Sequence, residues 1–291
     1  MKTSAIIHSA MAMLGLKEKM EKMILENSFS KEANKIPASM LKQFRIQTTL
    51  INERNVWSIA AQNPVPGKVI LYLHGGAYCF NINRQQWRLV EQIVLKTGVE
   101  VIVPDYPLAP ENTVVDTFAF MEELYSTMLD KDNFRQVYFI GDSAGGGLAL
   151  AFAQHIVQQQ TLQPSHIFLI SAWLDVSMTN PDQLQYEKKD HILSRKGLTI
   201  AGSNYAGNID LQDYRVSPLY GDLHFSATIS IFTGTNDLLH PEAKALNLKL
   251  LSQNIPHHYF EYPDMFHDWV IVPALKESKE VINWIVEQTG E

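Results

Sequence analysis

The chain has 291 residues, of which 46% are apolar, and this is typical of one globular domain with a small accessory lobe. Its formal net charge of −7 argues against a nucleic-acid partner, because nucleic-acid-binding proteins carry basic surfaces. The only cysteine, Cys79, excludes an intramolecular disulfide and a metal site built from several thiolates.

The start of the chain is mildly apolar but is interrupted by Ser4, His8 and Ser9, whereas a secretory signal has a purer apolar stretch. No apolar run reaches the roughly 20 residues that a membrane span needs. We therefore expect a soluble, cytoplasmic protein without stable membrane insertion.

Strand and helix signals alternate along most of the chain. Residues 44–61 predict an antiparallel hairpin at the edge of a sheet. Beyond it, short β-branched runs predict strands over residues 68–74, 99–105, 136–142, 165–171, 228–234 and 257–263. Helical periodicity predicts helices over residues 85–98, 113–131, 144–160, 241–254 and 273–290. This alternation predicts an α/β fold with a mostly parallel central sheet and helices on both faces.

Two regions interrupt this alternation. Residues 1–43 have helical signals without strands, and residues 175–215 are polar and irregular, with a helix predicted near residues 195–207. We expect both regions to form a cap over a catalytic domain, whose two parts are residues 44–174 and 216–291.

A serine surrounded by glycines follows the third strand of the predicted parallel sheet. Residues 141–145 read Gly-Asp-Ser-Ala-Gly, and G-x-S-x-G between a strand and a helix is typical of a nucleophile elbow. The helix N-terminus favours negative charge developing near Ser143. The alternatives are a glycine-rich turn with an incidental serine, or a phosphate loop, although the lysine of a phosphate loop is absent from this motif.

A serine hydroxyl needs a base and donors that stabilise an oxyanion. His74-Gly75-Gly76 follows a predicted strand, and adjacent glycines there allow two backbone N–H groups to face one oxygen. With the N–H group of Ala144, this predicts an oxyanion hole made by Gly75, Gly76 and Ala144. A simple tight turn is the alternative.

An acid and a histidine follow the serine, in the chain order that a fold with a nucleophile elbow uses. Asp237 lies on the predicted loop after the strand 228–234, and His267 lies on the loop after the last strand. Loops at the carboxyl edge of a parallel sheet gather over one site, so we expect Ser143, Asp237 and His267 to form a catalytic triad.

Other acids and histidines have less suitable positions. Asp264 and Asp268 are too close to His267 in the chain to hold its far ring nitrogen, and His155 lies within a predicted helix. The pair His257-His258 lies within a predicted strand and lacks metal-ligand spacing. We expect no metal and no cofactor.

Seven segments of the chain resemble the hormone-sensitive-lipase-like branch of the α/β-hydrolases, a family rich in microbial carboxylesterases. In the family's order they are LYLHGGAY, VPDYPLAPE, IGDSAGGGLA, SAWLDVS, VSPLYGDL, GTNDLLHPEA and FHDW. The resemblance implies Ser143 as nucleophile, Asp237 and His267 as its partners, and a helical cap. Ala77 stands where the family often has a third glycine.

These features predict a serine carboxylesterase that hydrolyses short- to medium-chain esters through an acyl-enzyme intermediate. An amidase, peptidase or arylformamidase with the same triad is an alternative, as is a small-molecule receptor without catalysis. The expected partner is a small-molecule ester, and a homodimer is left open. Leu16, Met20, Met23 and Ile24 form a helical stripe that predicts either cap packing or an apolar wall above the site.

Overall fold

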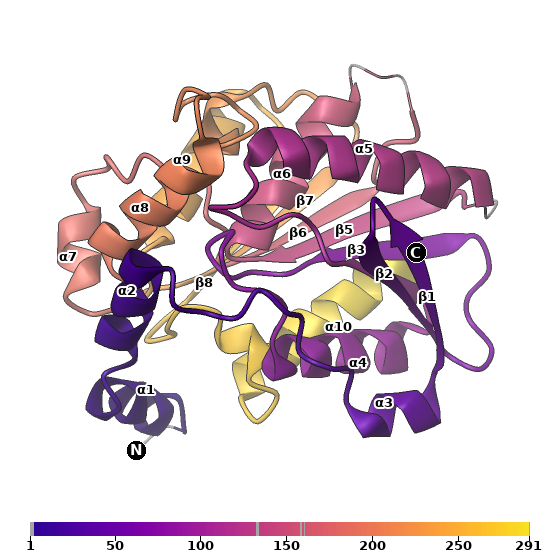
Figure 1. The fold of residues 1–291 in the computed structure, drawn as a ribbon, viewed down its shortest axis with the longest axis horizontal. Helices are drawn as coiled ribbons and strands as arrows, with labels where there is room; N and C mark the ends of the chain where they lie inside the picture. The colour runs from indigo at the N-terminus through magenta and orange to yellow at the C-terminus, as the bar shows by residue number, and fades with distance from the viewer. Residues whose placement is uncertain (1–2, 132–133, 158, 160, 291) are drawn as a thin grey trace.

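The computed structural model describes residues 3–131, 134–157, 159 and 161–290 (Figure 1). Four parts of the sequence predictions therefore lie outside the described residues. They are residues 1–2 of the cap, residues 132–133 of the first part of the catalytic domain, residues 158 and 160 of the predicted helix 144–160, and residue 291.

Among the described residues, eight strands form one sheet in the order β1-β2-β4-β3-β5-β6-β7-β8. Their bounds are β1 Arg45–Ile51, β2 Arg54–Ala60, β3 Lys68–Leu73, β4 Glu100–Pro104, β5 Gln136–Asp142, β6 His166–Ile170, β7 Thr228–Gly234 and β8 His257–Tyr262. β1 and β2 form the predicted hairpin, and β2 is also antiparallel to β4. All other neighbouring pairs are parallel, so the prediction of a mostly parallel sheet is confirmed.

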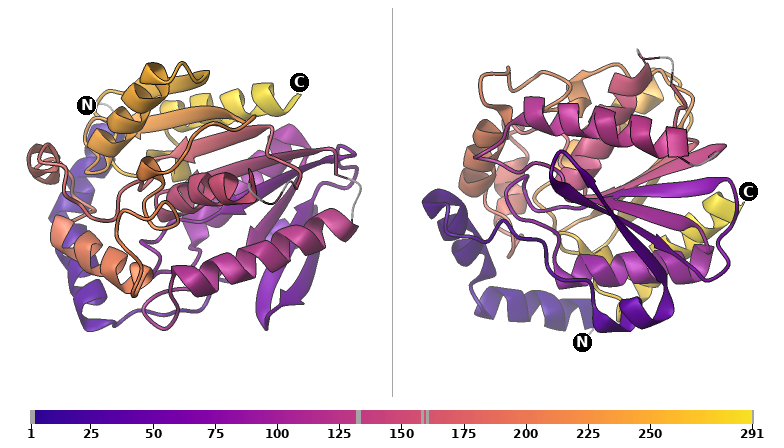
Figure 2. Two further views of the ribbon diagram at one scale, coloured as in Figure 1. Left: turned by 90° about the horizontal axis from the view of Figure 1, so that it is seen from above. Right: turned by 45° about the vertical axis from the view of Figure 1, so that its right-hand side comes forward.

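Helices cover both faces of the sheet, as the ribbon shows (Figures 1 and 2). One face carries α5 (Val114–Lys131), α6 (Ala144–Val157) and α9 (His240–Ser252), and the other carries α4 (Arg84–Thr97) and α10 (Lys276–Gly290). Successive strand residues point to opposite faces. Leu71 therefore packs in the core beneath α6, whereas Ile70 and Tyr72 pack beneath α4 and α10.

Helices from two distant parts of the chain lie together at one end of the molecule (Figure 1). They are α1 (Thr3–Met13) and α2 (Leu16–Glu26), with α7 (Gln183–Glu187) and α8 (Arg195–Ala206). The Lys17 ammonium donates to the carbonyl of Asp190 at 3.3 Å, and Lys196 pairs with Glu21 at 3.4 Å. The buried side chain of Ile24 also packs near Gly197. These contacts fasten α2 to the segment that contains α7 and α8.

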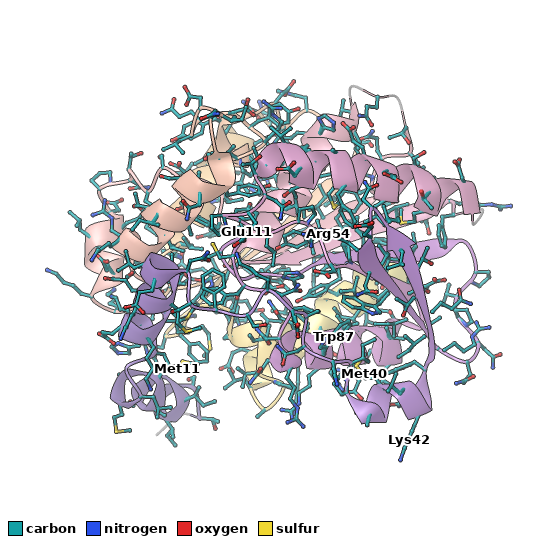
Figure 3. The ribbon with its side chains drawn as sticks, viewed as in Figure 1. Met11, Met40, Lys42, Arg54, Trp87 and Glu111 are labelled. Carbon is teal, nitrogen blue, oxygen red and sulfur yellow. The ribbon has the colours of Figure 1, made fainter. Side chains whose placement is uncertain are left out.

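The helix α3 (Ala38–Gln43) lies below β1 and β2, on the opposite side of Figure 1 from α1. Met40 is fully buried in the cluster that contains Trp57 and Trp87 (Figure 3), whereas Lys42 points outward. Two short 3-10 helices, η1 (Pro218–Tyr220) and η2 (Trp269–Ile271), complete the described elements.

Candidate active site

Ser143 occupies the tight turn between β5 and α6, where its φ of 50° lies in the left-handed region. A Cβ atom at Gly141 would lie 2.2 Å from the carbonyl oxygen of Gly145, and one at Gly145 would lie 2.0 Å from that of Leu73. Only glycine fits on both sides of the serine. This strained turn holds the hydroxyl beside the first residues of α6.

The structure brings Ser143, Asp237 and His267 together, although the serine and histidine are 124 residues apart. His267 Nε2 lies 3.0 Å from Ser143 Oγ, and His267 Nδ1 lies 3.1 Å from each carboxylate oxygen of Asp237. The three residues are 6%, 0% and 5% exposed in chain order. In this geometry the imidazole can take the hydroxyl proton while the carboxylate orients the ring.

The residues predicted to form an oxyanion hole lie around Ser143: Gly75 and Gly76 line the cavity beside it, and Ala144 begins α6. The N–H group of Gly75 stabilises the buried Asp142 carboxylate, and a Cβ atom at Gly75 would lie 2.5 Å from Asp142 Oδ2. Gly75 also lines the cavity beside Ser143, so its role as an oxyanion donor stays a prediction.

The next two residues of this loop, Gly76 and Ala77, line the cavity beside Ser143. Their φ angles of 131° and 52° are both positive. In the part of the chain that the structure describes, no hydrogen bond uses the N–H group of either residue. Together with the N–H group of Ala144 at the start of α6, they are candidate donors to an oxyanion beside the predicted Gly75.

A buried network below this loop was not predicted from the sequence. Gln86 of α4 donates to Asp142 Oδ2 at 2.7 Å and to the carbonyl of Gly75 at 3.3 Å. Tyr72 of β3 donates to Asp142 Oδ1 at 2.5 Å. Burial raises the pKa of Asp142, although these hydrogen bonds lower it in part. Gln86 thus ties the loop that carries Gly76 to the residue preceding Ser143.

A second unpredicted residue, Asp190, reaches the site from the segment before α8. Its fully buried carboxylate accepts from the N–H groups of Ile192 and Leu193, and also from Leu238 at 2.8 Å. Leu238 directly follows Asp237, so Asp190 fixes the loop that positions the acid of the triad. Burial and the nearby Asp237 carboxylate raise the pKa of Asp190 to about 6.

Asp268 forms a third contact that the sequence did not indicate. Asp237, not Asp268, contacts His267 Nδ1. The Oδ2 atom of Asp268 instead lies 3.3 Å from Nε2, the nitrogen that faces Ser143. The φ of 55° at Asp268 turns its side chain back toward the preceding histidine. Burial alone lowers the pKa of His267, but the carboxylates of Asp268, Asp237 and Asp190 outweigh it and raise this pKa to about 10.

A cavity of about 680 Å³ opens above Ser143 and His267. Met11 of α1, labelled in Figure 3, lines it together with Met20 and Met23 of α2. Ile24, the last residue of the predicted stripe, is instead buried in the protein core. The helical stripe therefore has both of the predicted roles: Met20 and Met23 line the cavity, and Ile24 packs in the protein core.

Two other histidines that the sequence analysis considered have different contacts. His155, on α6, lies within hydrogen-bond distance of Tyr214 and Glu122. His257 Nδ1 donates to the carbonyl of Ile255. Among the described residues, no group of three or more histidine, cysteine, aspartate or glutamate side chains is arranged to hold a metal ion. None of the described helices combines the length and the apolar character that crossing a bilayer requires.

A serine, an acid and a histidine in this order, gathered at the carboxyl edge of a mostly parallel sheet, define the α/β-hydrolase class. The profile of a family described as having the alpha/beta hydrolase fold matches residues 70–271. Because this match covers well over half of the chain, the protein belongs to that α/β-hydrolase family.

Proteins named as a lipase or an esterase are similar in sequence to most of this chain. A triacylglycerol lipase of Mycobacterium tuberculosis is 31% identical over 78% of this chain, but the chain spans only 47% of that lipase. An esterase of Acinetobacter venetianus is 28% identical over 76% of this chain and 74% of its own length. These similarities place the chain among hydrolases that resemble carboxylesterases and lipases.

Solved structures share the fold over nearly the whole chain. A protein of Staphylococcus aureus has a TM-score of 0.83 and 28% identity, and the alignment covers 94% of this chain and 90% of the other. An esterase from the bacterial hormone-sensitive lipase family has a TM-score of 0.79 and 24% identity, with coverages of 94% and 96%. The predicted α/β-hydrolase fold and its family resemblance are confirmed.

Proposed function

We propose that the protein is a serine carboxylesterase acting on esters with short- to medium-length acyl chains. Ser143 Oγ attacks the ester carbonyl while His267 takes its proton, and Asp237 orients the imidazole and stabilises its charge. The observation that carries this proposal is the position of His267, with Nε2 3.0 Å from the serine hydroxyl and Nδ1 3.1 Å from the Asp237 carboxylate.

The N–H groups of Gly76, Ala77 and Ala144 are assigned to the oxyanion, and one such donor contributes about 3 kcal/mol in the transition state. When the carbon–oxygen bond of the ester breaks, His267 returns the proton to the leaving alcohol. Water then attacks the acyl-enzyme with the same histidine as base, and the acid is released. The proposal requires no cofactor.

The proposed acyl-chain length follows from the walls of the cavity. We assign residues 1–43 and 175–215 to the cap, as the sequence suggests, with α1 and α2 as its cavity-facing part. Met11, Met20 and Met23 are half-buried and line the cavity. Methionine side chains are flexible and apolar, which suits acyl chains of differing length.

The test is a series of p-nitrophenyl esters from acetate to decanoate, together with Ser143→Ala. We expect kcat/KM to peak at short or medium chains and to fall about 10⁴-fold or more in the variant. A fluorophosphonate probe should label the wild-type serine and leave the folded variant unlabelled. Undiminished turnover by Ser143→Ala would contradict the proposal.

Matched amide substrates separate an esterase from an amidase, since the same triad can cut both bonds. Faster turnover of butyryl p-nitroanilide than of p-nitrophenyl butyrate would replace the proposed function by an amidase. A folded wild-type sample that neither labels nor turns over any ester would favour a receptor without catalysis.

A further inference from the structure

Asp268 places a second carboxylate on the catalytic imidazole, at the nitrogen that faces substrate. Its Oδ2 lies 3.3 Å from His267 Nε2, whereas Asp237 occupies the opposite nitrogen. Asp268 lines the cavity above Ser143. Its other oxygen, Oδ1, has no hydrogen-bond partner among the described residues. A carboxylate with unused acceptor capacity at this place is costly unless a donor arrives.

The reaction brings a leaving oxygen next to this carboxylate. His267 Nε2 must pass its proton to the alcohol oxygen of the ester, so that oxygen has to come within about 3 Å of Nε2. Asp268 Oδ2 lies at a similar distance from the same atom. The leaving oxygen and the carboxylate are therefore within about 6 Å of each other, and a group one carbon away can bridge them.

We infer that Asp268 is a specificity-determining residue that favours esters whose alcohol part carries a free hydroxyl group beside the scissile oxygen, such as monoesters of polyols. The inference rests on the proposed esterase function and adds its substrate class. The hydroxyl donates to the carboxyl group of Asp268, and this leaves His267 Nε2 free to serve the leaving oxygen. A simple alkyl ester brings no such donor, so Asp268 Oδ1 stays without a hydrogen-bond partner.

The remainder of the cavity suits such an amphipathic molecule. Met20 and Met23 provide an apolar wall for the acyl chain, whereas Ser30, Glu32 and Lys35 line the same cavity with polar groups. A polyol monoester has one apolar arm and one hydroxylated arm, which matches these two kinds of wall.

A neutral hydroxyl fits Asp268 better than a cation does. Burial raises the pKa of Asp268 well above its usual range, with the carboxylates of Asp142, Asp237 and Asp190 adding to the effect while His267 opposes it. A cation is stabilised only by the ionised carboxylate, whereas a hydroxyl can hydrogen-bond to either protonation state.

The experiment compares three butyrate esters at one fixed pH: glycerol 1-monobutyrate, propyl butyrate and butyrylcholine. The first two share a three-carbon alcohol skeleton and differ in hydroxyl groups. We expect wild-type kcat/KM for glycerol monobutyrate to exceed that for propyl butyrate about tenfold or more, as one hydrogen bond to a charged group allows. Butyrylcholine, which is cationic but has no donor, should gain no such advantage.

Two variants of Asp268 test whether its carboxyl group causes the ratio of kcat/KM for glycerol monobutyrate to kcat/KM for propyl butyrate. Asp268→Gly removes the acceptor and suits the left-handed backbone, so the ratio should approach one while propyl butyrate turnover rises. Asp268→Asn keeps one acceptor oxygen and should restore part of the ratio. Asp264→Asn is the matched control, because Asp264 is an exposed, left-handed aspartate on the same loop; its ratio should equal that of the wild type.

Three results would overturn the inference while leaving the esterase intact: equal wild-type rates on the two uncharged butyrates, an unchanged ratio in Asp268→Gly, or a preference for butyrylcholine. The comparison of the two uncharged butyrates with the wild-type protein tests the inference even if a variant fails to fold. Absence of turnover on every ester would instead overturn the proposed function, and this inference with it.

Discussion

At the scale of single residues, His267 is enclosed by carboxylates on more than one side. Asp237 follows β7, Asp190 comes from the segment before α8, and Asp268 adjoins the histidine. The histidine must be neutral to accept the serine proton. Since these carboxylates raise its pKa to about 10, the activity should increase with pH into the alkaline range.

Asp268→Asn tests this electrostatic effect. Removing one negative charge beside His267 lowers the histidine pKa, so the acid limb of the kcat/KM profile should move to lower pH by about one unit. The measurement is a pH–rate profile on p-nitrophenyl butyrate, with Asp264→Asn as the variant that should leave the limb in place. An acid limb unmoved in Asp268→Asn would show that its charge does not reach the imidazole.

The members of the candidate triad could be predicted because each follows a strand and because their order is informative. Asp190 and Gln86 could not be predicted, since their contacts depend on how the chain segments pack. The position of Asp268 in the chain excludes it only as a partner for the far nitrogen of His267. Its left-handed backbone, with φ 55°, directs it to the near nitrogen instead, and no sequence pattern specifies that angle.

At the scale of elements, α2 has two roles: it packs against the rest of the protein, and it lines the cavity. Its helical stripe indicated both roles, but periodicity alone cannot say which residue packs and which faces an opening. The structure separates them, because Ile24 is buried while Met20 and Met23 line the cavity. Likewise, α3 lies within the segment assigned to the cap, and its Met40 packs into the cluster of Trp57 and Trp87.

Met23→Trp tests the role of the methionine wall. A larger, stiffer side chain fills part of the cavity, so kcat/KM should fall about tenfold or more for the decanoate ester and change little for the acetate. The p-nitrophenyl ester series measures this change in chain-length profile. Met13→Trp is the control, because Met13 is 82% exposed; the proposal fails if both variants shift the profile equally.

At the scale of the whole molecule, the sheet is the part that the sequence specified most completely. Short apolar runs separated by segments of helical periodicity predicted the strands and helices of the sheet layer, among them α4. The strand order and the two core layers follow from the packing of covered strands. The relation of the cap to the sheet could not be predicted, because it depends on contacts between segments far apart in sequence.

Phe168→Ala tests the stability of this framework. Phe168 is fully buried on β6 in the layer beneath α4 and α10, so its truncation should lower the free energy of unfolding by about 3–5 kcal/mol. Urea unfolding followed by circular dichroism measures the loss. Leu248→Ala, at an exposed position of α9, should change stability by less than about 0.5 kcal/mol. Equal losses in the two variants would contradict this description of the core.

The contacts between Lys17 on α2 and the backbone near Asp190 have a consequence for biosynthesis. These partners are 173 residues apart, so α2 leaves the ribosome long before the segment on which it docks has been made. Closing such a distance along the chain also adds a loop-closure cost, which grows slowly with the length of the loop. The serine turn of the newly made protein therefore stays uncovered by α2 at least until residue 190 has been synthesised.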